Sequence, residues 1–456
     1  MEIIHPPIRI VSGIIGVQKY KEAVQYRKTR HQIILPCEDG TLFYHMLTGE
    51  LLLLRPGENE ETCRMELIRH WFLVPQDFDE CKQSDDVRQL GKLLQKQTNE
   101  RTSFTILTTT DCNARCYYCY EMGISRYAMT PETAKDVGEH IVRVCGGEKV
   151  KLSWFGGEPL YNAGVIDVIC SVLQEQTVEY SSIMTSNGFY LDAQTALKAI
   201  RDWHVHTVQI TIDGTESVYN RTKAFIDRDV SSPFQRVMDN IESALDASLN
   251  VVIRLNMDRA NAEDLFALVD VIADRFGHRS NLFGRVALLG QFEGKIHAFS
   301  SAQEACDFQI RLQDKLKSFG MEMKPSLKRC LHFNQCMADN DSCEVILPDG
   351  RIERCEHVRE SEVIGTIFDE ARDAEKVQAW RETMSFPECK ECEMYPMCVI
   401  LKKCEWNQNG CPETRRNNNR RNVKAALLAD YRREKEAVGK ESNETETGLY
   451  FGGSRW

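Results

Sequence analysis

Three cysteines in one short loop are the residues of this chain whose type and spacing could do chemistry. Cys112, Cys116 and Cys119 are spaced CxxxCxxC within DCNARCYYCYE, directly after an apolar, strand-like run. A cubane [4Fe–4S] cluster takes four ligands, so three cysteines leave one iron open to a cofactor or substrate, as in catalytic metal sites. A zinc site or three chance cysteines are the alternatives on spacing alone. Zinc would require a fourth Cys or His nearby, and this loop contains none.

Short turns with glycine or polar residues follow several other apolar runs. Such residues at strand ends could contact a ligand, and glycine permits a close backbone approach because it has no side chain. Taken singly, each segment also fits an ordinary turn after a strand. The residues are Gly156, Gly157, Glu158 and Pro159 after VKLSWF, Ser186 and Asn187 after SSIMT, Asp213 after TVQITI, and Asn256 at the end of VVIRLN.

Together and in this order, CxxxCxxC, GGEP, TSNG and TIDG resemble the motifs of the radical S-adenosylmethionine (SAM) superfamily. The resemblance covers about residues 105–290. It implies that the amine and carboxylate of SAM chelate the open iron, and that one electron from the cluster cleaves SAM to methionine and a 5′-deoxyadenosyl radical. That radical abstracts a hydrogen atom from an unactivated C–H bond, while the protein positions and shields the cofactor.

The same resemblance implies which residues contact SAM. Gly156 and Gly157 let the backbone approach the amine of SAM, and Glu158 accepts an amine N–H. Arg221, which follows Asp213, pairs with the SAM carboxylate, a task that suits a guanidinium group. The other implied contacts are Tyr118 beside the adenine, Ser186 and Asn187 at the ribose, and Pro159, Asp213 and Asn256 elsewhere around the cofactor.

A second group of cysteines lies near the end of the chain. Of the 18 cysteines, most of those outside the first loop fall between Cys330 and Cys411. Eight thiolates would complete two [4Fe–4S] clusters or two four-coordinate zinc sites, and the spacing alone leaves both open. The eight candidates are Cys336, Cys343, Cys355, Cys389, Cys392, Cys398, Cys404 and Cys411.

The pattern Gx4C followed by CxxCx5C resembles the SPASM extension of radical SAM enzymes that modify peptides. The resemblance implies two auxiliary [4Fe–4S] clusters, and therefore three clusters in all. The family's block usually ends in Cx3C, whereas Cys398 and Cys404 are spaced Cx5C, so the assignment of Cys404 and Cys411 is the least secure and Cys330 is an alternative ligand. By this pattern Cys336, Cys343, Cys355 and Cys404 hold an inner auxiliary cluster, and Cys389, Cys392, Cys398 and Cys411 hold an outer one.

Alternating strands and helices must position these groups. Six apolar runs alternate with helical segments, which predicts an α/β fold with a parallel sheet and right-handed crossovers. Six repeats fall short of an eight-fold barrel, so we expect a partial (β/α)6 TIM barrel whose chemistry lies at the carboxyl ends of the strands. The expected strands are 105–109, 150–155, 181–185, 207–212, 251–256 and 285–290, and the expected helices are 131–145, 164–176, 192–202, 233–247, 262–275 and 302–318.

The residues before the barrel predict a small α/β domain, which we expect to be winged-helix-like. HQIILP and TLFYHML flank a turn at Asp39-Gly40 and predict a hairpin over 30–54. A helix over 59–73, with Asn59 as its N-cap, and a polar helix over 83–99 are expected to follow.

The residues after the barrel have a different character. Residues 328–414 show little periodicity, so we expect them to bury little apolar surface and to be held together by metal ligation. A terminal helix over 420–438 and a mobile tail from Gly439 are expected to follow. The predicted domains are 1–100 for peptide recognition, 101–300 for the barrel, 301–327 for a bridging helix, 328–420 for the SPASM extension, and 421–456 for the last helix and tail.

Composition excludes several classes of function. Hydrophobic residues make up 42% of the chain, which excludes a disordered protein. A net charge of -11 argues against non-specific binding to nucleic acid or to a membrane surface. The sequence MEIIHPPIRI lacks the features of a signal peptide, and no apolar run is long enough to cross a membrane. We therefore expect a cytoplasmic protein with neither nucleic acid nor membrane as a partner.

These resemblances together predict a peptide maturase that oxidatively crosslinks a ribosomally synthesised precursor through a thioether, carbon–carbon or carbon–oxygen bond. Auxiliary clusters can accept the electron that a substrate radical loses when the new bond forms. The N-terminal domain would bind a leader peptide by adding it as a strand to a sheet edge, although it could also be a structural cap or a dimer surface. The chain resembles sactionine, ranthipeptide and streptide-type maturases, and a flavodoxin- or ferredoxin-type protein would donate the electron.

Two alternatives remain. More distantly, the chain resembles anaerobic sulfatase maturases, which form formylglycine and carry an Asp base immediately after the cysteine that matches Cys355. Here that position is Glu356, a longer carboxylate that could still deprotonate the substrate. The other alternative is a non-catalytic iron–sulfur or zinc scaffold for electron transfer, which would have no need of an open iron.

Overall fold

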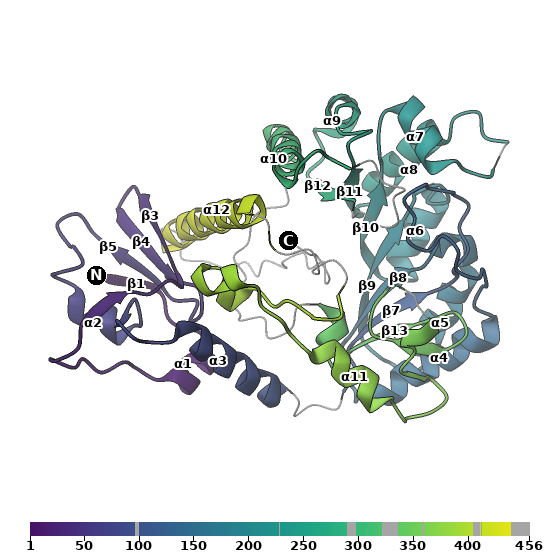
Figure 1. Ribbon diagram of the computed structural model, residues 1–456. Helices are drawn as coiled ribbons and strands as arrows, with labels where there is room; N and C mark the ends of the chain where they lie inside the picture. Colours follow the sequence, from purple (N-terminus) through teal and green to yellow (C-terminus); the bar gives the residue numbers. More distant parts are fainter. Residues whose placement is uncertain are drawn as a thin grey trace. The chain divides into compact units, whose positions relative to one another are not determined.

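The computed structural model describes residues 1–95, 100–227, 229–289, 298–321, 336–357, 360–404, 411 and 413–438 (Figure 1). The chain divides into two compact units, which are treated separately below. Unit 1 consists of Met1–Thr98, Lys324–Asp339 and Glu382–Trp456, and unit 2 consists of Asn99–Met323 and Asn340–Arg381. The segment 328–420 is thereby divided between the two units. Cys330 and the tail from Gly439 lie outside the described residues.

A nine-stranded sheet forms the centre of unit 2. Its order is β12-β11-β10-β9-β8-β7-β13-β14-β15, and the six strands β7 to β12 are parallel and adjacent in chain order. This arrangement confirms the predicted partial (β/α)6 barrel. The six strands are β7 (Ser103–Leu107), β8 (Val150–Phe155), β9 (Tyr180–Ser186), β10 (Val205–Thr211), β11 (Asn250–Met257) and β12 (Leu282–Leu288).

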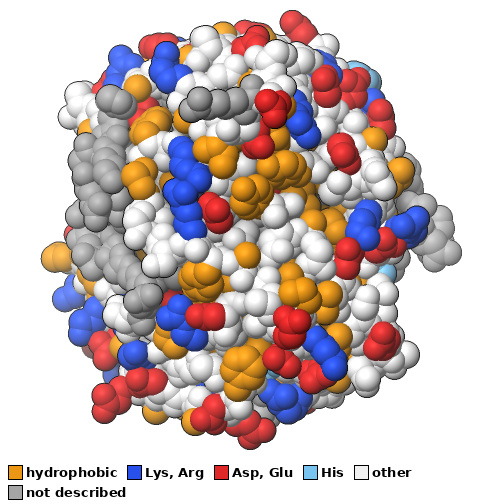
Figure 2. Space-filling model, turned by 90° about the vertical axis from the view of Figure 1, so that its right-hand side faces the viewer, with side chains coloured by type: hydrophobic (Ala, Val, Ile, Leu, Met, Phe, Trp, Pro, Cys, Tyr) orange, Lys and Arg blue, Asp and Glu red, His pale blue; other side chains and the backbone are white. Residues whose placement is uncertain are grey.

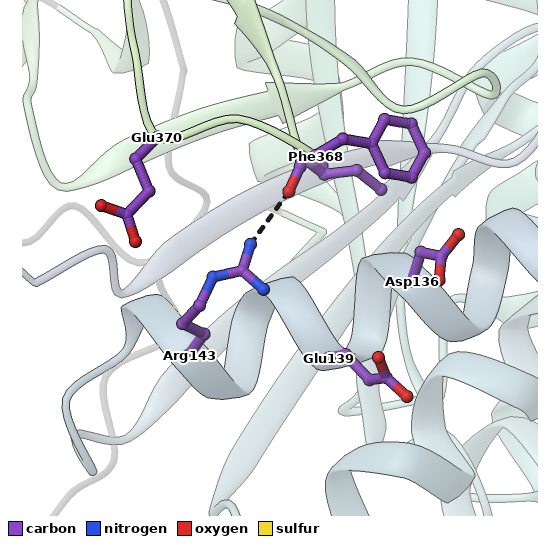
Figure 3. A pocket seen from close by; sticks show the side chains of 6 residues that line it. Asp136, Glu139, Arg143, Phe368 and Glu370 are labelled. Carbon is purple, nitrogen blue, oxygen red and sulfur yellow. Dashed lines mark hydrogen bonds between the residues drawn. The ribbon is translucent and has the colours of Figure 1, made fainter.

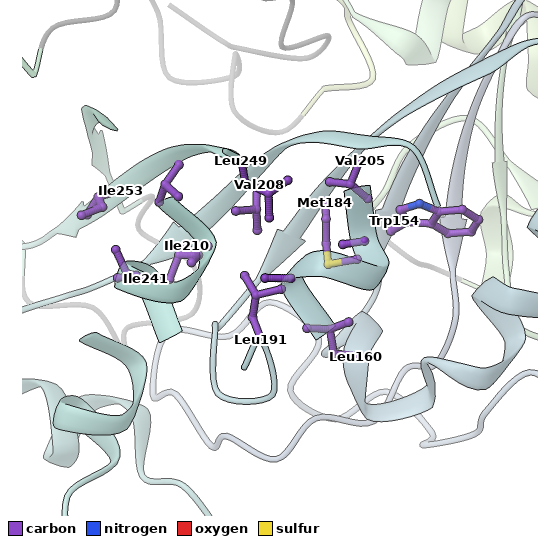
Figure 4. Close-up of a cluster of buried hydrophobic side chains, with 14 of the residues drawn as sticks. Trp154, Leu160, Met184, Leu191, Val205, Val208, Ile210, Ile241, Leu249 and Ile253 are labelled. Atoms are coloured by element: carbon purple, nitrogen blue, oxygen red, sulfur yellow. The ribbon is translucent and has the colours of Figure 1, made fainter. Parts of the chain in front are cut away.

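Helices cover the outer face of these strands. Alternate strand residues such as Trp154, Met184, Val208 and Ile253 are almost fully buried in one apolar core against the helices (Figure 4). Because strand side chains alternate between faces, the intervening residues face the other side, toward the interior of the barrel. The helices are α4 (Pro131–Val144), α5 (Gly164–Glu175), α6 (Ala193–Arg201), α7 (Glu216–Lys223), α8 (Pro233–Asp246), α9 (Asp264–Phe276) and α10 (Ala302–Ser318).

Part of the Cys-rich segment extends the barrel sheet, which the sequence analysis did not predict. Strand β13 (Cys343–Ile346) pairs in parallel with β7, and β14 (Arg351–Glu353) and β15 (Gly365–Thr366) continue the sheet in antiparallel fashion. A buried carboxylate anchors it, because His140 Nε2 lies 2.8 Å from Glu344 Oε2. The expectation that 328–414 buries little apolar surface is wrong here, since Val345 and Ile346 are fully buried. Helix α11 (Ala374–Arg381) follows.

Unit 1 contains a four-stranded antiparallel sheet in the order β1-β5-β4-β3. The predicted hairpin is confirmed by β3 (Gln32–Cys37) and β4 (Gly40–His45). In β5 (Leu51–Leu54) all four leucines are buried, with Leu51 and Leu53 in one core cluster and Leu52 and Leu54 in another. The sheet is therefore covered on both faces. The remaining strands of unit 1 are β1 (Glu2–His5), β2 (Tyr26–Lys28) and β6 (Leu73–Pro75).

Helices from both ends of the chain cover this sheet. Helix α12 (Glu413–Val438) begins earlier than the predicted 420, and its Leu427 and Tyr431 pack in the cluster that contains Leu51 and Leu53. Helix α2 (Arg64–Arg69) packs on the opposite face through Leu67 and Ile68. Helices α1 (Arg9–Ile15) and α3 (Glu80–Gln95) complete the unit.

The predicted helix over 59–73 is wrong in its length. The Asn59 side chain accepts from the backbone N–H groups of Glu61 and Thr62 and so forms a turn before α2 begins. The helix ends before Trp71, whose φ of 67° lies in the left-handed region that terminates helices. Leu73 belongs to β6 instead.

One face of the molecule shows acidic and basic side chains interspersed, with hydrophobic side chains grouped near its centre (Figure 2). Within the described residues, no helix is long and apolar enough to cross a membrane.

Candidate active site

The first cysteine loop begins where β7 ends, at the carboxyl edge of the parallel sheet. Backbone hydrogen bonds tie it to the segment around the end of α7, from Arg115 N to Lys223 O at 2.7 Å and from Ile226 N to Asn113 O at 2.9 Å. Asn113 is fully buried and accepts from Asn187 Nδ2 at 2.7 Å. The loop is therefore held by the segment around the end of α7 and, through the Asn113 side chain, by Asn187 after β9.

The three thiols of this loop are partly buried and influence one another's pKa. Burial raises the pKa of Cys112 to about 12 and that of Cys119 to about 11, and nearby carboxylates and the other thiols add to both shifts. Burial also raises the pKa of Cys116, although Lys223 opposes this shift. The thiols therefore hold their protons until a cation binds, and binding would release them. Among the described side chains, no group of three or more His, Cys, Asp or Glu is already arranged as a metal site.

The two glycines after β8 pack directly against the start of this loop. A Cβ on Gly157 would lie 2.2 Å from the carbonyl oxygen of Asp111, and one on Gly156, whose φ is 118°, would lie 2.2 Å from that of Thr109. Gly157 N donates to Thr109 O and Glu158 N to Asp111 O, both at 3.0 Å. The close backbone approach that these glycines permit is thus an approach to the cysteine loop itself.

Glu158 organises the next strand end. Its fully buried carboxylate accepts from Asn187 N at 2.7 Å, Ser186 Oγ at 2.8 Å and Leu160 N at 3.1 Å. Burial raises its pKa to about 7 although these hydrogen bonds oppose the shift. A carboxylate has about four lone-pair sites, so one acceptor site remains for a ligand N–H.

A buried ion pair lies after β10. Lys223 Nζ is 2.9 Å from Asp213 Oδ2 and 2.9 Å from the hydroxyl of Tyr118, which also donates to Asp213. Despite burial, the Asp213 carboxylate raises the pKa of Lys223. Arg221, the residue expected to pair with a carboxylate, is exposed on the same helix. The cation that reaches this site is therefore Lys223, which the sequence analysis missed.

The helical period could have found Lys223. In α7 the buried residues are Tyr219, Thr222 and Lys223, the spacing of one helix face. Arg221 falls between them, on the opposite face. A search for the strongest cation near Asp213 therefore selects the exposed Arg221 rather than the buried Lys223 unless α7 is recognised as a helix.

The end of β11 is tied to the same site. Asn261 Nδ2 donates to Asp213 O at 2.9 Å and to Asn256 O at 2.8 Å, and so links the ends of β10 and β11. Asp258 accepts from the hydroxyl of Tyr117 at 2.7 Å, which fastens the cysteine loop to β11. Asn261 and Asp258 were not predicted as site residues.

These residues fit the implied cluster and SAM. Three thiols lie on one loop, the glycine segment holds that loop by its backbone, and Glu158 keeps an acceptor free. Asp213 Oδ1 is fully buried and has no hydrogen-bond partner among the described residues, which marks a position for a ligand donor. Pro159 is buried and opens the short turn after Glu158.

Tyr120 connects this loop to the second cysteine region within unit 2. Its ring stacks on His357 with centroids 4.2 Å apart. Burial raises its pKa well above the ordinary value, and the nearby Glu121, Glu356, Cys119 and Cys355 raise it further. Cys355 and Glu356 therefore lie close to the first cysteine loop.

The remaining predicted ligands divide between the units. Cys343 and Cys355 belong to unit 2, whereas Cys336 and Cys404 belong to unit 1, so the inner set stays a prediction. In unit 1 burial raises the pKa of Cys392, and Cys411 and Cys389 add to the shift. Three members of the predicted outer set are thus neighbours. The fourth, Cys398, is exposed.

Helix α3 holds this outer segment in unit 1. Arg88 Nη2 donates to Tyr395 O at 2.9 Å and to Cys398 O at 3.4 Å. The Tyr395 hydroxyl in turn donates to Asp85 at 2.8 Å. The N-terminal segment and the CxxCx5C segment are therefore parts of one unit.

A separate pocket of about 210 Å³ lies between α4 and the residues after β15. Arg143 donates to the backbone oxygen of Ile367 at 2.9 Å across it, and Asp136, Glu139 and Glu370 surround it (Figure 3). None of the candidate active-site residues lines this pocket.

The fold agrees with comparisons to known proteins. Residues 106–272 match the model of the radical SAM superfamily. The chain therefore contains a radical SAM domain, a class of iron–sulfur enzyme domain whose cofactors are SAM and a [4Fe–4S] cluster.

Curated relatives match less than half of the chain. A probable GTP 3′,8-cyclase of Methanocella arvoryzae is 24% identical over 220 residues, which is 47% of this chain and 64% of that protein. A probable GTP 3′,8-cyclase of Methanococcus maripaludis is 26% identical over 150 residues, 32% of this chain and 46% of that protein. The chain thus spans about half the length of these relatives.

Solved structures share the fold over a larger part of the chain. Native anSMEcpe with bound AdoMet and Cp18Cys peptide has a TM-score of 0.53 and 14% identity, and the match covers 74% of this chain and 99% of that one. Streptococcus suis SuiB bound to precursor peptide SuiA has a TM-score of 0.51 and 12% identity, with 84% and 96% covered. At these identities the likeness shows the fold alone.

Proposed function

We propose that this chain is a radical SAM peptide maturase that oxidatively crosslinks residues of a ribosomally synthesised precursor. The observation that carries the proposal is the stacking of Tyr120, which follows Cys119, on His357, which lies two residues after Cys355. A crosslink removes two hydrogens from the peptide, so the enzyme needs a second oxidising group near the first. The fold likeness to SuiB, which was solved with a precursor peptide, supports a peptide as the substrate.

In this proposal Cys112, Cys116 and Cys119 hold the first cluster, and the ends of β8 to β11 hold SAM. When bound, SAM and this cluster supply a radical that abstracts a hydrogen atom from a C–H bond. Glu158 accepts from the amine of SAM, and Lys223, neutralised in part by Asp213, faces its carboxylate. The buried walls around these residues exclude water from the reacting atoms.

Eight further cysteines would hold two auxiliary [4Fe–4S] clusters, whose chemistry is the acceptance of single electrons. Anaerobically reconstituted protein should then contain about twelve irons. An iron content near four with bound zinc would remove the auxiliary clusters from the proposal. An absence of 5′-deoxyadenosine after reduction with SAM would instead favour a non-catalytic scaffold.

Co-expression with a candidate precursor peptide tests the reaction directly. Mass spectrometry should show a loss of two hydrogens from the peptide, and the loss should disappear in Cys116→Ala. A peptide left unchanged while GTP is converted would assign the chain to the reaction class of its curated relatives instead. A flavodoxin- or ferredoxin-type donor should support turnover in place of chemical reductant.

Recognition of the leader peptide is proposed for unit 1. Its strands β1 and β3 are the edges of the four-stranded sheet, and an edge strand can pair with an extended peptide. A photo-crosslinking amino acid at Pro36, which is exposed in β3, should capture the precursor. The same group at Met65, exposed on α2, is the matched control. Equal capture at both positions would remove the recognition role.

Formylglycine formation is the second candidate, favoured by the likeness to anSMEcpe and by the place of Glu356 after Cys355. A short cysteine-containing peptide should then be oxidised at its cysteine, and Glu356→Gln should abolish the oxidation while SAM cleavage continues. Crosslinking without formylglycine would decide against it.

A further inference from the structure

Two arginines lie side by side on adjacent strands of the barrel. Arg254 in β11 is paired in register with Arg285 in β12. Their neighbours Ile253, Leu255 and Val286 belong to the apolar core beneath the helices. Because strand side chains alternate, both arginines face the barrel interior.

Arg254 points toward the end of the barrel where the chemistry lies. Its Nε donates to Asn256 Oδ1 at 2.8 Å, and Asn256 is two residues nearer the carboxyl end of the strand. By register Arg254 is level with Thr211 of β10, two positions before Asp213. The pair therefore lies just inside the mouth that holds the candidate active site.

Within the described ranges, Arg285 has no counter-ion. No hydrogen bond or ion pair to it occurs among the residues that the structure describes. Burial lowers its pKa to about 10, and the neighbouring charge of Arg254 lowers it further. No carboxylate compensates for either effect. Buried charges are ordinarily paired with an opposite charge. The described residues supply no anion to these two arginines.

The described carboxylates of the site are bound to groups other than the two arginines. Asp213 is paired with Lys223, Asp258 accepts from Tyr117, and Glu158 accepts three hydrogen bonds. Among the residues that the structure describes, none supplies the missing anion, so a ligand is the candidate source.

We propose that Arg254 and Arg285 form a subsite that binds a carboxylate of the peptide substrate, supplied by an acidic side chain. That the ligand is a peptide rests on the proposed function. Guanidinium groups match a planar carboxylate through paired hydrogen bonds. The carboxylate of SAM is the other source of the same chemistry, but in the proposed site that carboxylate faces Lys223 of α7. The arginines lie on β11 and β12, the last two of the six parallel strands, whereas the cysteine loop follows β7 at the other edge of these six.

The test titrates anaerobic holoprotein with N-acetyl-glutamate N-methylamide and with its glutamine counterpart, followed by saturation-transfer NMR. The glutamate probe should bind and the glutamine probe should bind roughly tenfold more weakly, the loss expected for charge-assisted hydrogen bonds. Arg285→Met should remove this preference. The control is Lys151→Met. Lys151 also lies on the interior face of the sheet, but it is exposed near the amino end of β8, so this variant should retain the preference. Equal binding of both probes to the wild type would overturn the proposal.

Two further measurements separate a binding role from a structural one. Because no described residue pairs with Arg285, Arg285→Met should leave the melting temperature unchanged or raise it, and a clear fall would show that the side chain is structural and overturn the proposal. The variant should also bind SAM within about twofold of the wild type. A tenfold loss of SAM affinity would place the SAM carboxylate on the pair and overturn the substrate assignment.

Once a precursor that the enzyme crosslinks is known, its KM provides a final test. Replacing its acidic residue by the amide should raise KM for the wild type but not for Arg285→Met. If no precursor is modified at all, the proposed function fails, while the probe titration still decides whether the arginine pair binds a carboxylate.

Discussion

Replacing Lys223 by methionine is the sharpest test of how the candidate active site is built. Lys223 and Asp213 form an ion pair whose side chains are 3% and 0% exposed. Removing the cation leaves Asp213 with only the Tyr118 hydroxyl, and Asp213 Oδ1 already lacks a partner. Breaking a buried ion pair from one side costs about 3–5 kcal/mol because an uncompensated charge stays inside the protein. For a unit of this size that corresponds to a fall in melting temperature of about 10 °C.

The matched control is Arg221→Met on the same helix. Arg221 is exposed, so its loss should change the melting temperature by about 1 °C at most. Adding Asp213→Asn to Lys223→Met removes both charges and should recover more than half of the lost stability. Scanning calorimetry under anaerobic conditions measures all four proteins. If Lys223→Met and Arg221→Met melt alike, or if the double variant is less stable than Lys223→Met, the buried pair does not have the role assigned here.

Three other perturbations have defined outcomes. Gly157→Ala should abolish cleavage of SAM and lower the melting temperature, because its Cβ would meet the Asp111 carbonyl oxygen at 2.2 Å, whereas Gly164→Ala, with nothing within 4 Å, should leave both unchanged. Cys116→Ala should abolish 5′-deoxyadenosine formation and remove about four of twelve irons; retention of cleavage would contradict the cluster assignment. Burial, together with His31, lowers the pKa of His45 to about 3, below its value of 6.5 when unfolded, so the unfolded chain binds more protons between these values. Stability of unit 1 should therefore be complete above pH 6.5 and fall below it by about 1.4 kcal/mol per pH unit for this residue. His45→Asn, which can still accept from the backbone N–H groups of Leu47 and Thr48, should reduce that slope in melting curves between pH 5 and 7.5, and an unchanged slope would contradict the reasoning.

The barrel could be predicted because its strands and helices carry strong local signals. VKLSWF became β8 without change, and the 14 residues after Thr130 form the capped helix α4. Strand β13 escaped prediction because its short run is buried only through pairing with β7, which is distant in sequence. The helix at 59–73 was predicted to start too early because the Asn59 side chain closes a turn rather than capping the helix.

The site shows the same division between local and distant information. Cys112 and Glu158 were predicted because each belongs to a motif at the end of its own strand. Asn261 and Lys223 were missed because their roles come from bonds to other strand ends. Gly157 was predicted to allow the backbone to approach SAM. In the structure its lack of a side chain also allows close contact with the backbone before Cys112.

The charges inside the barrel separate what the chain holds from what it must receive. Lys223 is a buried cation with its own carboxylate, so its charge is already balanced and it can orient a zwitterionic ligand without a large change in solvation. Arg285 has the opposite character, because it stands beside a second arginine and its pKa is lowered rather than raised. An unbalanced cation reduces stability unless a ligand neutralises it, and a site that gains an anion on binding discriminates strongly against neutral analogues. The difference between these two cations is therefore the reason to look for cofactor binding at one and substrate selection at the other.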